Sequence, residues 1–114
     1  MPLYFKILSY LRGVMKLIRR NIKQIIALCE QYKVKELCAF GSILTDNFNE
    51  ESDVDFTVVF EKTAQTDSFL QYFNLKFALE ALLNRSVDLI EYEAIRNPYF
   101  KKEVDNTRQF IYGS

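Results

Sequence analysis

The hydrophobic residues of this chain change their spacing along the sequence, and the first regular spacing predicts a helix from Lys16 to Lys33. Apolar side chains recur there at steps of four and three, which is typical of a helix that buries one face. They are Ile18, Ile22, Ile25, Cys29 and Tyr32. Gly13 comes shortly before this stretch, and we expect it to separate the helix from the apolar residues that open the chain.

Three shorter apolar runs predict strands, at residues 35–40, 53–60 and 86–91. After an acidic start, the second run is apolar on both faces, which is typical of a central strand that is covered on each side. Side chains alternate across a strand, so Asp88 in the third run faces away from its apolar neighbours. If the third strand pairs beside the second, Asp88 reaches the same face as Asp53 and Asp55.

Two further helices and a tail complete the pattern. Residues 69–83 have a wide apolar face, which we expect to lie in the core, and Asn84 suits the left-handed residue after a helix end. The apolar residues are Phe69, Tyr72, Phe73, Leu75, Leu79, Leu82 and Leu83. Asn97 and Pro98 suit the start of a short last helix, and residues 108–112 form a final edge strand or a docked tail.

This order of elements predicts an α/β or α+β domain in which a small mixed sheet packs against helices. A chain of 114 residues is expected to form one domain, here residues 15–114. We predict that residues 1–14 are an N-terminal extension that the fold does not need. The competing interpretation is an apolar segment that packs on a partner.

The composition excludes several functions. Fifteen basic and fifteen acidic residues give zero net charge, which disfavours a general nucleic-acid binder. The chain has no histidine, so histidine-ligated zinc and Ser-His-Asp catalysis are excluded. No run approaches the roughly 18 apolar residues of a membrane-spanning helix. Cys29 and Cys38 match no metal or redox spacing and are predicted to be reduced core residues of a cytoplasmic protein.

Two carboxylates at the start of the second strand carry the first chemical signal. Asp53 and Asp55 are separated by one residue, so they point to the same face, about 7 Å apart along the strand. Carboxylates so close together repel each other and resist burial unless a cation lies between them. Hard cations with oxygen ligands suit this arrangement, Mg²⁺ above all, and Mg²⁺ commonly brings the phosphates of a nucleotide as further ligands.

Gly41 and Ser42 supply the second signal, directly behind the first strand. Glycine allows a sharp turn and a close approach of the ligand, and serine suits the cap of a helical turn whose free amides bind anions. A phosphate-binding turn beside a two-carboxylate metal site is the apparatus of phosphoryl or nucleotidyl transfer.

Residues 40–59 read F-G-S-I-L-T-D-N-F-N-E-E-S-D-V-D-F-T-V-V, and residues 86–91 read S-V-D-L-I-E. Gly-Ser, then Asp-x-Asp, then V-D-L in this order resembles the minimal nucleotidyltransferases (MNT) of the DNA polymerase beta-like superfamily. The resemblance covers roughly residues 16–113. It implies the nucleotidyltransferase fold and makes Asp88 the third carboxylate of the site.

The resemblance also implies roles for these residues. Asp53 and Asp55 would hold Mg²⁺ on the triphosphate of ATP, and Asp55 with Asp88 a second Mg²⁺ beside the acceptor hydroxyl. Gly41 and Ser42 would bind the outer phosphates. Many relatives carry a basic residue shortly after the Gly-Ser pair, whereas this chain continues Ile-Leu-Thr. The candidates for a more distant cation are Arg85, Lys76 and Lys62.

Some members of this family are antitoxins that pair with a HEPN-domain RNase toxin and transfer AMP from ATP to it. The resemblance therefore implies a Mg²⁺-dependent protein adenylyltransferase, because the chain is too short for a second domain that would bind a small acceptor. Two alternatives stay open: an idle module that acts by complex formation, and a small-molecule nucleotidyltransferase completed by a second subunit. The partners to consider are ATP, a HEPN toxin and a second copy of the chain.

Overall fold

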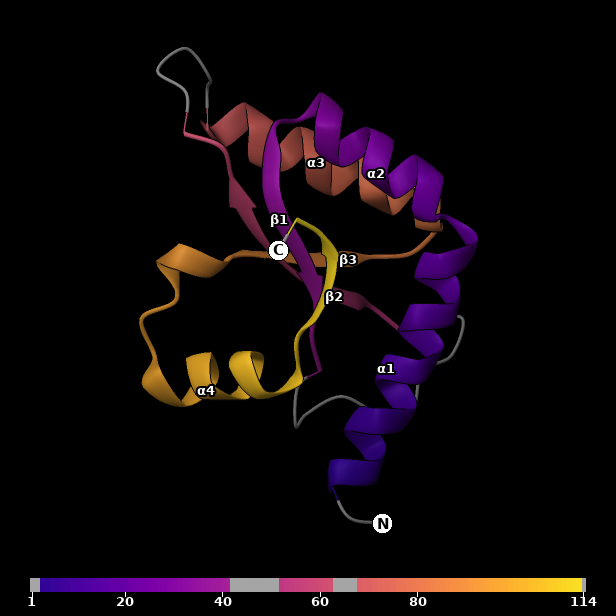
Figure 1. The fold of residues 1–114 in the computed structure, drawn as a ribbon, viewed down its shortest axis with the longest axis vertical. Coiled ribbons are helices and arrows are strands. Elements are labelled where there is room, and N and C mark those ends of the chain that lie inside the picture. The colour runs from indigo at the N-terminus through magenta and orange to yellow at the C-terminus, as the bar shows by residue number, and fades with distance from the viewer. Residues whose placement is uncertain (1–2, 42–51, 63–67, 114) are drawn as a thin grey trace.

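The computed structural model describes residues 3–41, 52–62 and 68–113, in which helices flank a four-stranded sheet (Figure 1). The helices are α1 (Leu3–Arg20), α2 (Ile22–Gln31), α3 (Ser68–Leu83) and α4 (Pro98–Thr107), with a 3-10 turn η1 (Tyr92–Ala94). The strands are β1 (Val34–Ala39), β2 (Val54–Phe60), β3 (Val87–Glu91) and β4 (Gln109–Tyr112). The predicted mixed α/β architecture is confirmed. None of the described helices is long and apolar enough to cross a membrane.

The strands lie in the order β3-β2-β1-β4. Strand β1 pairs antiparallel with both β2 and β4, whereas β2 pairs parallel with β3. A parallel pair needs a long crossover connection, and α3 lies in the one between β2 and β3. The prediction that residues 53–60 form a central strand is confirmed, and residues 109–112 form the expected edge strand.

The main hydrophobic core lies between the sheet and the helices α1, α2 and α3. Val54, Phe56 and Val58 of β2 point into it and are buried. The helices contribute Tyr10, Leu11, Val14, Ile18, Ile25, Cys29, Leu75, Leu79 and Leu83. Each fully buried aliphatic side chain of this kind contributes roughly 1.5–3 kcal/mol. Because side chains alternate along a strand, this core leaves the other face of β2 to Asp55 and Thr57.

The first two helices differ from the prediction. Helix α1 continues through Gly13 to Arg20, and the chain breaks at Asn21 instead. Four α1 side chains are buried in the core, namely Tyr10, Leu11, Val14 and Ile18. Their burial outweighs the roughly 1 kcal/mol that a glycine costs inside a helix. The Asn21 side chain donates to the carbonyl of Leu17 at 2.9 Å and helps to end α1.

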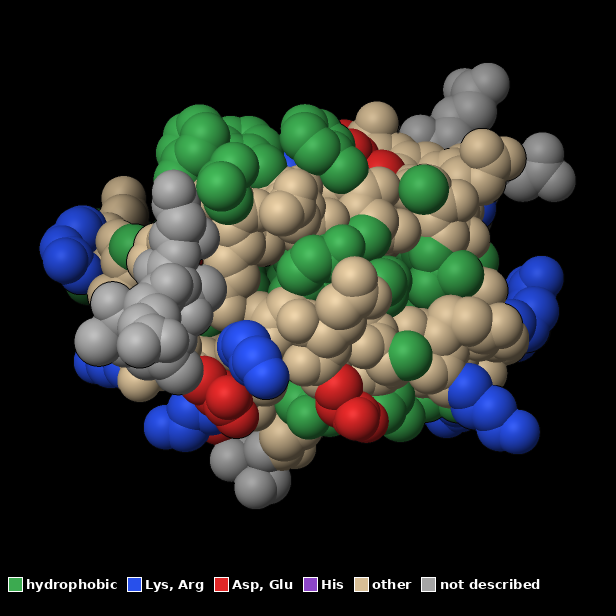
Figure 2. All heavy atoms as spheres, turned by 90° about the horizontal axis from the view of Figure 1, so that it is seen from above, with side chains coloured by type: hydrophobic (Ala, Val, Ile, Leu, Met, Phe, Trp, Pro, Cys, Tyr) green, Lys and Arg blue, Asp and Glu red, His purple; other side chains and the backbone are tan. Residues whose placement is uncertain are grey.

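Helix α3 is only partly the core helix that its sequence predicts. Figure 2 looks onto the side formed by α2 and α3 and shows hydrophobic side chains gathered among scattered charges. Leu75, Leu79 and Leu83 are buried as expected. Phe69 was also expected in the core but is 69% exposed. Phe77, which was not part of the predicted face, is 58% exposed on the same helix.

Two asparagines fix the chain on either side of β3, as predicted. Asn84 follows α3 with a φ of 54°, the left-handed conformation expected there. The side-chain oxygen of Asn97 accepts hydrogen bonds from the backbone N–H groups of Tyr99 and Phe100, at 2.9 and 3.1 Å. Pro98 occupies the first turn of α4, where its missing N–H costs nothing.

Candidate active site

The parallel pairing of β2 with β3 brings the second and third predicted carboxylates side by side. Asp55 and Asp88 are direct partners in this pairing, on strands that lie about 4.8 Å apart. Both belong to the face of the sheet opposite the main core. Asp53 precedes β2 and contributes its negative charge to the same site. Asp53 and Asp88 are exposed, whereas Asp55 is half-buried.

The surroundings of Asp55 disfavour its ionised form. Burial raises its pKa most, and the hydrogen bond from Tyr10 acts in the opposite direction. The negative charges of Asp88, Asp53 and Glu103 raise it further, so that the pKa of Asp55 reaches about 6. A cation at this place would relieve the repulsion among the carboxylates, because an opposite charge stabilises the ionised form.

The donor set fits Mg²⁺ by its chemistry. Carboxylate oxygens are the ligands that Mg²⁺ prefers, usually one or two of them together with substrate phosphates. Among the described residues, the ion pairs are Lys76–Glu80 and Arg108–Asp105, so neither draws on these carboxylates. The same residues contain no three acidic or cysteine side chains already close enough to hold one ion.

Gly41 lies next to the carboxylates, at the end of β1. The N–H of the preceding residue, Phe40, donates to the carbonyl of Asp55 at 3.2 Å. The Gly41 N–H, predicted to bind phosphate, donates to Oγ1 of Thr107 at 3.2 Å. A phosphate that used this amide would have to displace Thr107. Ser42 lies outside the described residues.

Arg85 is the candidate cation that contacts the chain next to Asp53. Its Nη1 donates to the carbonyl of Ser52 at 3.1 Å, directly before Asp53. Lys76 is ion-paired within α3. Lys62 follows the far end of β2, and roughly 20 Å of extended chain separates it from Asp55. Position therefore ranks Arg85 first among the three.

Three residues near the site could not be found from the sequence. Tyr10 contacts Asp53 and Asp55 from α1, whereas Glu103 and Thr107 approach from α4. Tyr10 stands 45 positions before Asp55, and Thr107 stands 66 positions after Gly41. Tyr10 belonged to the apolar opening segment that was predicted to be dispensable, and Glu103 and Thr107 carried no signal at all.

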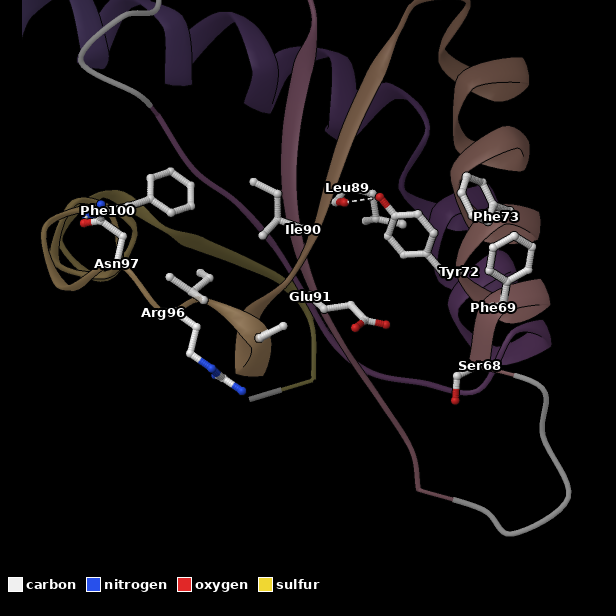
Figure 3. A pocket seen from close by; sticks show the side chains of 12 residues that line it. Ser68, Phe69, Tyr72, Phe73, Leu89, Ile90, Glu91, Arg96, Asn97 and Phe100 are labelled. Carbon is white, nitrogen blue, oxygen red and sulfur yellow. Dashed lines mark hydrogen bonds between the residues drawn. The ribbon is translucent and has the colours of Figure 1, made fainter.

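An open, largely apolar pocket of about 650 Å³ adjoins the site along β3 (Figure 3). Phe69, Tyr72 and Phe73 line it from α3, and Phe100 from α4. The Tyr72 hydroxyl donates to the carbonyl of Leu89, the residue after Asp88. Burial and then the charge of Asp88 raise the pKa of Tyr72. The pocket therefore begins at Leu89, one residue after the third predicted carboxylate.

Comparison with known proteins points to the same chemistry. The family model described as polymerase beta, nucleotidyltransferase, matches residues 23–114. "Putative protein adenylyltransferase MJ0128" of Methanocaldococcus jannaschii is 40% identical over 94 residues, which are 82% of this chain and 91% of that protein. Protein adenylyltransferase MntA of Thermococcus cleftensis is 37% identical over 70 residues, 61% of this chain and 68% of that protein.

A solved structure shares the fold. It is described as a tri-AMPylated HEPN toxin of Shewanella oneidensis in complex with an MNT antitoxin. The match has a TM-score of 0.59 at 20% identity, and it covers 84% of this chain and 72% of the matched chain. At this identity the likeness shows the fold alone.

Proposed function

The chain belongs to the polymerase beta nucleotidyltransferase family, and from this membership we propose that it transfers AMP from ATP to a hydroxyl group of a partner protein, with Mg²⁺. The partner that we propose is a HEPN-type RNase toxin, which the transfer would inactivate. Relatives named as protein adenylyltransferases support the reaction, and the complex of an AMPylated HEPN toxin with an MNT antitoxin supports the partner.

The observation that carries this proposal is the pairing of Asp55 with Asp88, with Asp53 two residues before Asp55. Asp53 and Asp55 are suited to hold one Mg²⁺ on the triphosphate, and Asp55 with Asp88 a second. Bound there, Mg²⁺ would neutralise phosphate charge and orient the reacting groups. Arg85 adds a positive charge behind Asp53.

For this reaction the protein has to position ATP and the acceptor hydroxyl and to provide one base for the hydroxyl proton. The oxygen of the acceptor hydroxyl attacks the α-phosphorus, the bond between this phosphorus and the bridging oxygen breaks, and pyrophosphate leaves. We assign Asp88 as the group that takes the hydroxyl proton, because it is exposed and is the carboxylate of β3 that pairs directly with Asp55. The apolar pocket beside Asp88 provides room for an acceptor side chain.

A second function, neutralisation of the partner by binding alone, is favoured by one observation. The Gly41 N–H that would contact phosphate is already engaged by Thr107. A chain in which this bond persists would bind nucleotide weakly and act only through complex formation. The third alternative, transfer to a small molecule with a second subunit, has no comparable support.

The experiment that separates these functions replaces Asp53 and Asp55 together with asparagine. The full chain and a purified HEPN-type RNase toxin are incubated with α-labelled ATP and Mg²⁺, and label on the toxin and RNase activity are both measured. Adenylylation predicts that label and neutralisation disappear together in the double variant. Neutralisation that survives without label identifies the binding-only function.

The matched control replaces two exposed carboxylates away from the site, as Glu61→Gln/Glu93→Gln. This variant loses the same charge and is expected to label the toxin as the wild type does. If the wild-type chain labels no protein in the presence of Mg²⁺, the adenylyltransferase proposal is wrong.

A further inference from the structure

The hydroxyl of Tyr10 reaches from α1 to the first residues of β2. The side chain is only 1% exposed, and its ring packs in the main core. Leu11, Val14 and Ile18 of the same helix are buried beside it. Packing therefore holds the ring in place, and the hydroxyl lies at the end of the sheet that carries Asp53 and Asp55.

Three polar atoms of Asp53 and Asp55 surround this hydroxyl. The Asp55 N–H donates to the Tyr10 oxygen at 3.0 Å. The Asp53 carbonyl lies 2.9 Å from the hydroxyl and Oδ2 of Asp55 lies 3.2 Å away. A hydroxyl has one proton, so it donates to one of these two oxygens at a time while it accepts the amide proton.

The effect is to tie together both ends of the Asp-Val-Asp segment. On the opposite side, the Val54 N–H donates to the carbonyl of Ser86 at 3.1 Å. The segment is thus held by α1 on one side and by the start of β3 on the other. A group bonded to both the backbone and the carboxylate of Asp55 limits where that carboxylate can point.

We propose that Tyr10 is a positioning residue of the active site: its hydroxyl fixes the spacing of Asp53 and Asp55 and the direction of the Asp55 carboxylate. The role of those carboxylates in holding Mg²⁺ and ATP rests on the proposed function, whereas the clamp itself belongs to the fold. In this proposal Tyr10 acts through the two aspartates and is not itself a ligand of substrate or cofactor.

This inference makes α1 part of the site, although α1 lies outside residues 23–114, which the family model matches. The ring of Tyr10 packs in the core and its hydroxyl contacts the aspartates. This one residue therefore links the stability of the core to the geometry of the carboxylates. A phenylalanine at this position would keep the packing and lose the clamp, which makes the two contributions separable.

The test is Tyr10→Phe in the full chain, with two measurements. The first is amide hydrogen exchange of the metal-free protein, read by NMR at two neighbouring amides. The Asp55 amide should exchange about fivefold faster, since one hydrogen bond is worth about 1 kcal/mol. The Val54 amide keeps its bond to Ser86 and should retain its protection.

The second measurement is calorimetric titration of Mg²⁺ with ATP, or of Mn²⁺ alone as the probe for the carboxylates. We expect affinity to fall about three- to tenfold in Tyr10→Phe, because Asp55 is no longer held in its ligating direction. The control is Tyr92→Phe, which likewise removes a hydroxyl bonded to a carboxylate, that of Asp105. It should change neither the Asp55 exchange nor the affinity.

Unchanged Asp55 exchange in Tyr10→Phe overturns the proposal, and so does a loss of protection shared equally by Val54, because that would be a general loss of stability. Unchanged metal affinity in a variant with faster Asp55 exchange also overturns the positioning role. If the wild type binds neither Mg²⁺ with ATP nor Mn²⁺, the proposed function fails. The clamp is then judged on the exchange measurement alone, which needs no ligand.

Discussion

Two helices from opposite ends of the chain approach the same carboxylates, but they are anchored differently. Helix α1 buries four side chains in the main core, and one of them, Tyr10, also contacts Asp55 through its hydroxyl. Helix α4 buries only Val104, and it is joined to the end of β1 by Thr107 and by an edge-to-face contact of Phe100 with Phe40. Figure 1 shows the two helices well apart, with the sheet between them.

This difference indicates that a firmly anchored helix, α1, and a less firmly anchored helix, α4, meet at one site. An element held by many core contacts cannot move without breaking them, so α1 is suited to fix the direction of a metal ligand. An element with few buried contacts opens at lower cost. Helix α4 carries the hydroxyl bonded to Gly41, so under the proposed function it is the part expected to move if a phosphate uses the Gly41 amide.

The largest effect is expected from removal of α1 as far as Val14. A chain that begins at Met15 loses three buried side chains, Tyr10, Leu11 and Val14, and each such loss costs roughly 2–5 kcal/mol. The sum is comparable to the whole stability of a small domain. We therefore expect little folded protein, as measured by circular dichroism and soluble yield.

A chain that begins at Ser9 keeps these three side chains and serves as the control. It should melt cooperatively, close to the full chain. If the chain from Met15 folds as well as the full chain, residues 1–14 are dispensable as the sequence suggested, and α1 is no anchor. This expectation stays a prediction, although the burial of Tyr10, Leu11 and Val14 argues against it.

A matched pair of valines tests the anchoring directly. Val14 on α1 and Val104 on α4 are both 0% exposed, but only Val14 belongs to the main core. We expect Val14→Ala to lower the free energy of unfolding by about 2 kcal/mol and Val104→Ala by about 1 kcal/mol, because the site around α4 can collapse onto the smaller side chain. Urea denaturation of both variants measures this, and equal losses would contradict the comparison.

The carboxylate between the helices should itself destabilise the metal-free protein. Asp55→Asn removes a half-buried charge that lies near three other carboxylates, so we expect the free energy of unfolding to rise by about 1–2 kcal/mol, after discounting for solvent screening. For a domain of this size the melting temperature should increase by roughly 5 °C. Glu61→Gln, at the far end of β2, should leave it unchanged.

The pH dependence has a definite sign. The pKa of Asp55 is raised to about 6 in the folded protein from 3.8, so the folded state binds this proton more tightly than the unfolded state. The resulting stabilisation is complete below about pH 4 and is lost as the pH rises through 6. The stability gap between Asp55→Asn and wild type should therefore widen over this range in metal-free buffer. A gap that narrows would show that the Asp55 pKa is lowered instead.

The smallest effect is expected at the α4 side of the comparison. Thr107→Val removes the hydroxyl that accepts the Gly41 N–H, so stability should fall by about 1 kcal/mol. If phosphate uses the Gly41 amide, the same variant should bind ATP at least as tightly as wild type, because no bond has to be displaced. Thr107→Ser, which keeps the hydroxyl, should behave as wild type in thermal melts and in calorimetry.

Much of the fold was predictable because it depends on local pattern. Short apolar runs at residues 53–60 and 86–91 located β2 and β3, and the expected bounds differ from the observed ones by one residue. Asn84 and Asn97 fixed the ends of the neighbouring helices through their own side-chain and backbone chemistry. The error at Gly13 has a physical cause. A glycine inside a helix costs about 1 kcal/mol, which is less than the free energy gained when four side chains are buried.

The sequence by itself determined which chemistry this protein has available: two spaced aspartates, a third on a later strand, a Gly-Ser turn and no histidine. Only the tertiary structure decided how these groups are held, because the register of β2 against β3 sets Asp88 opposite Asp55. It also placed Tyr10 and Thr107 on the site, across 45 and 66 positions of sequence. Contacts over such separations arise from packing in three dimensions, and no spacing along the chain records them.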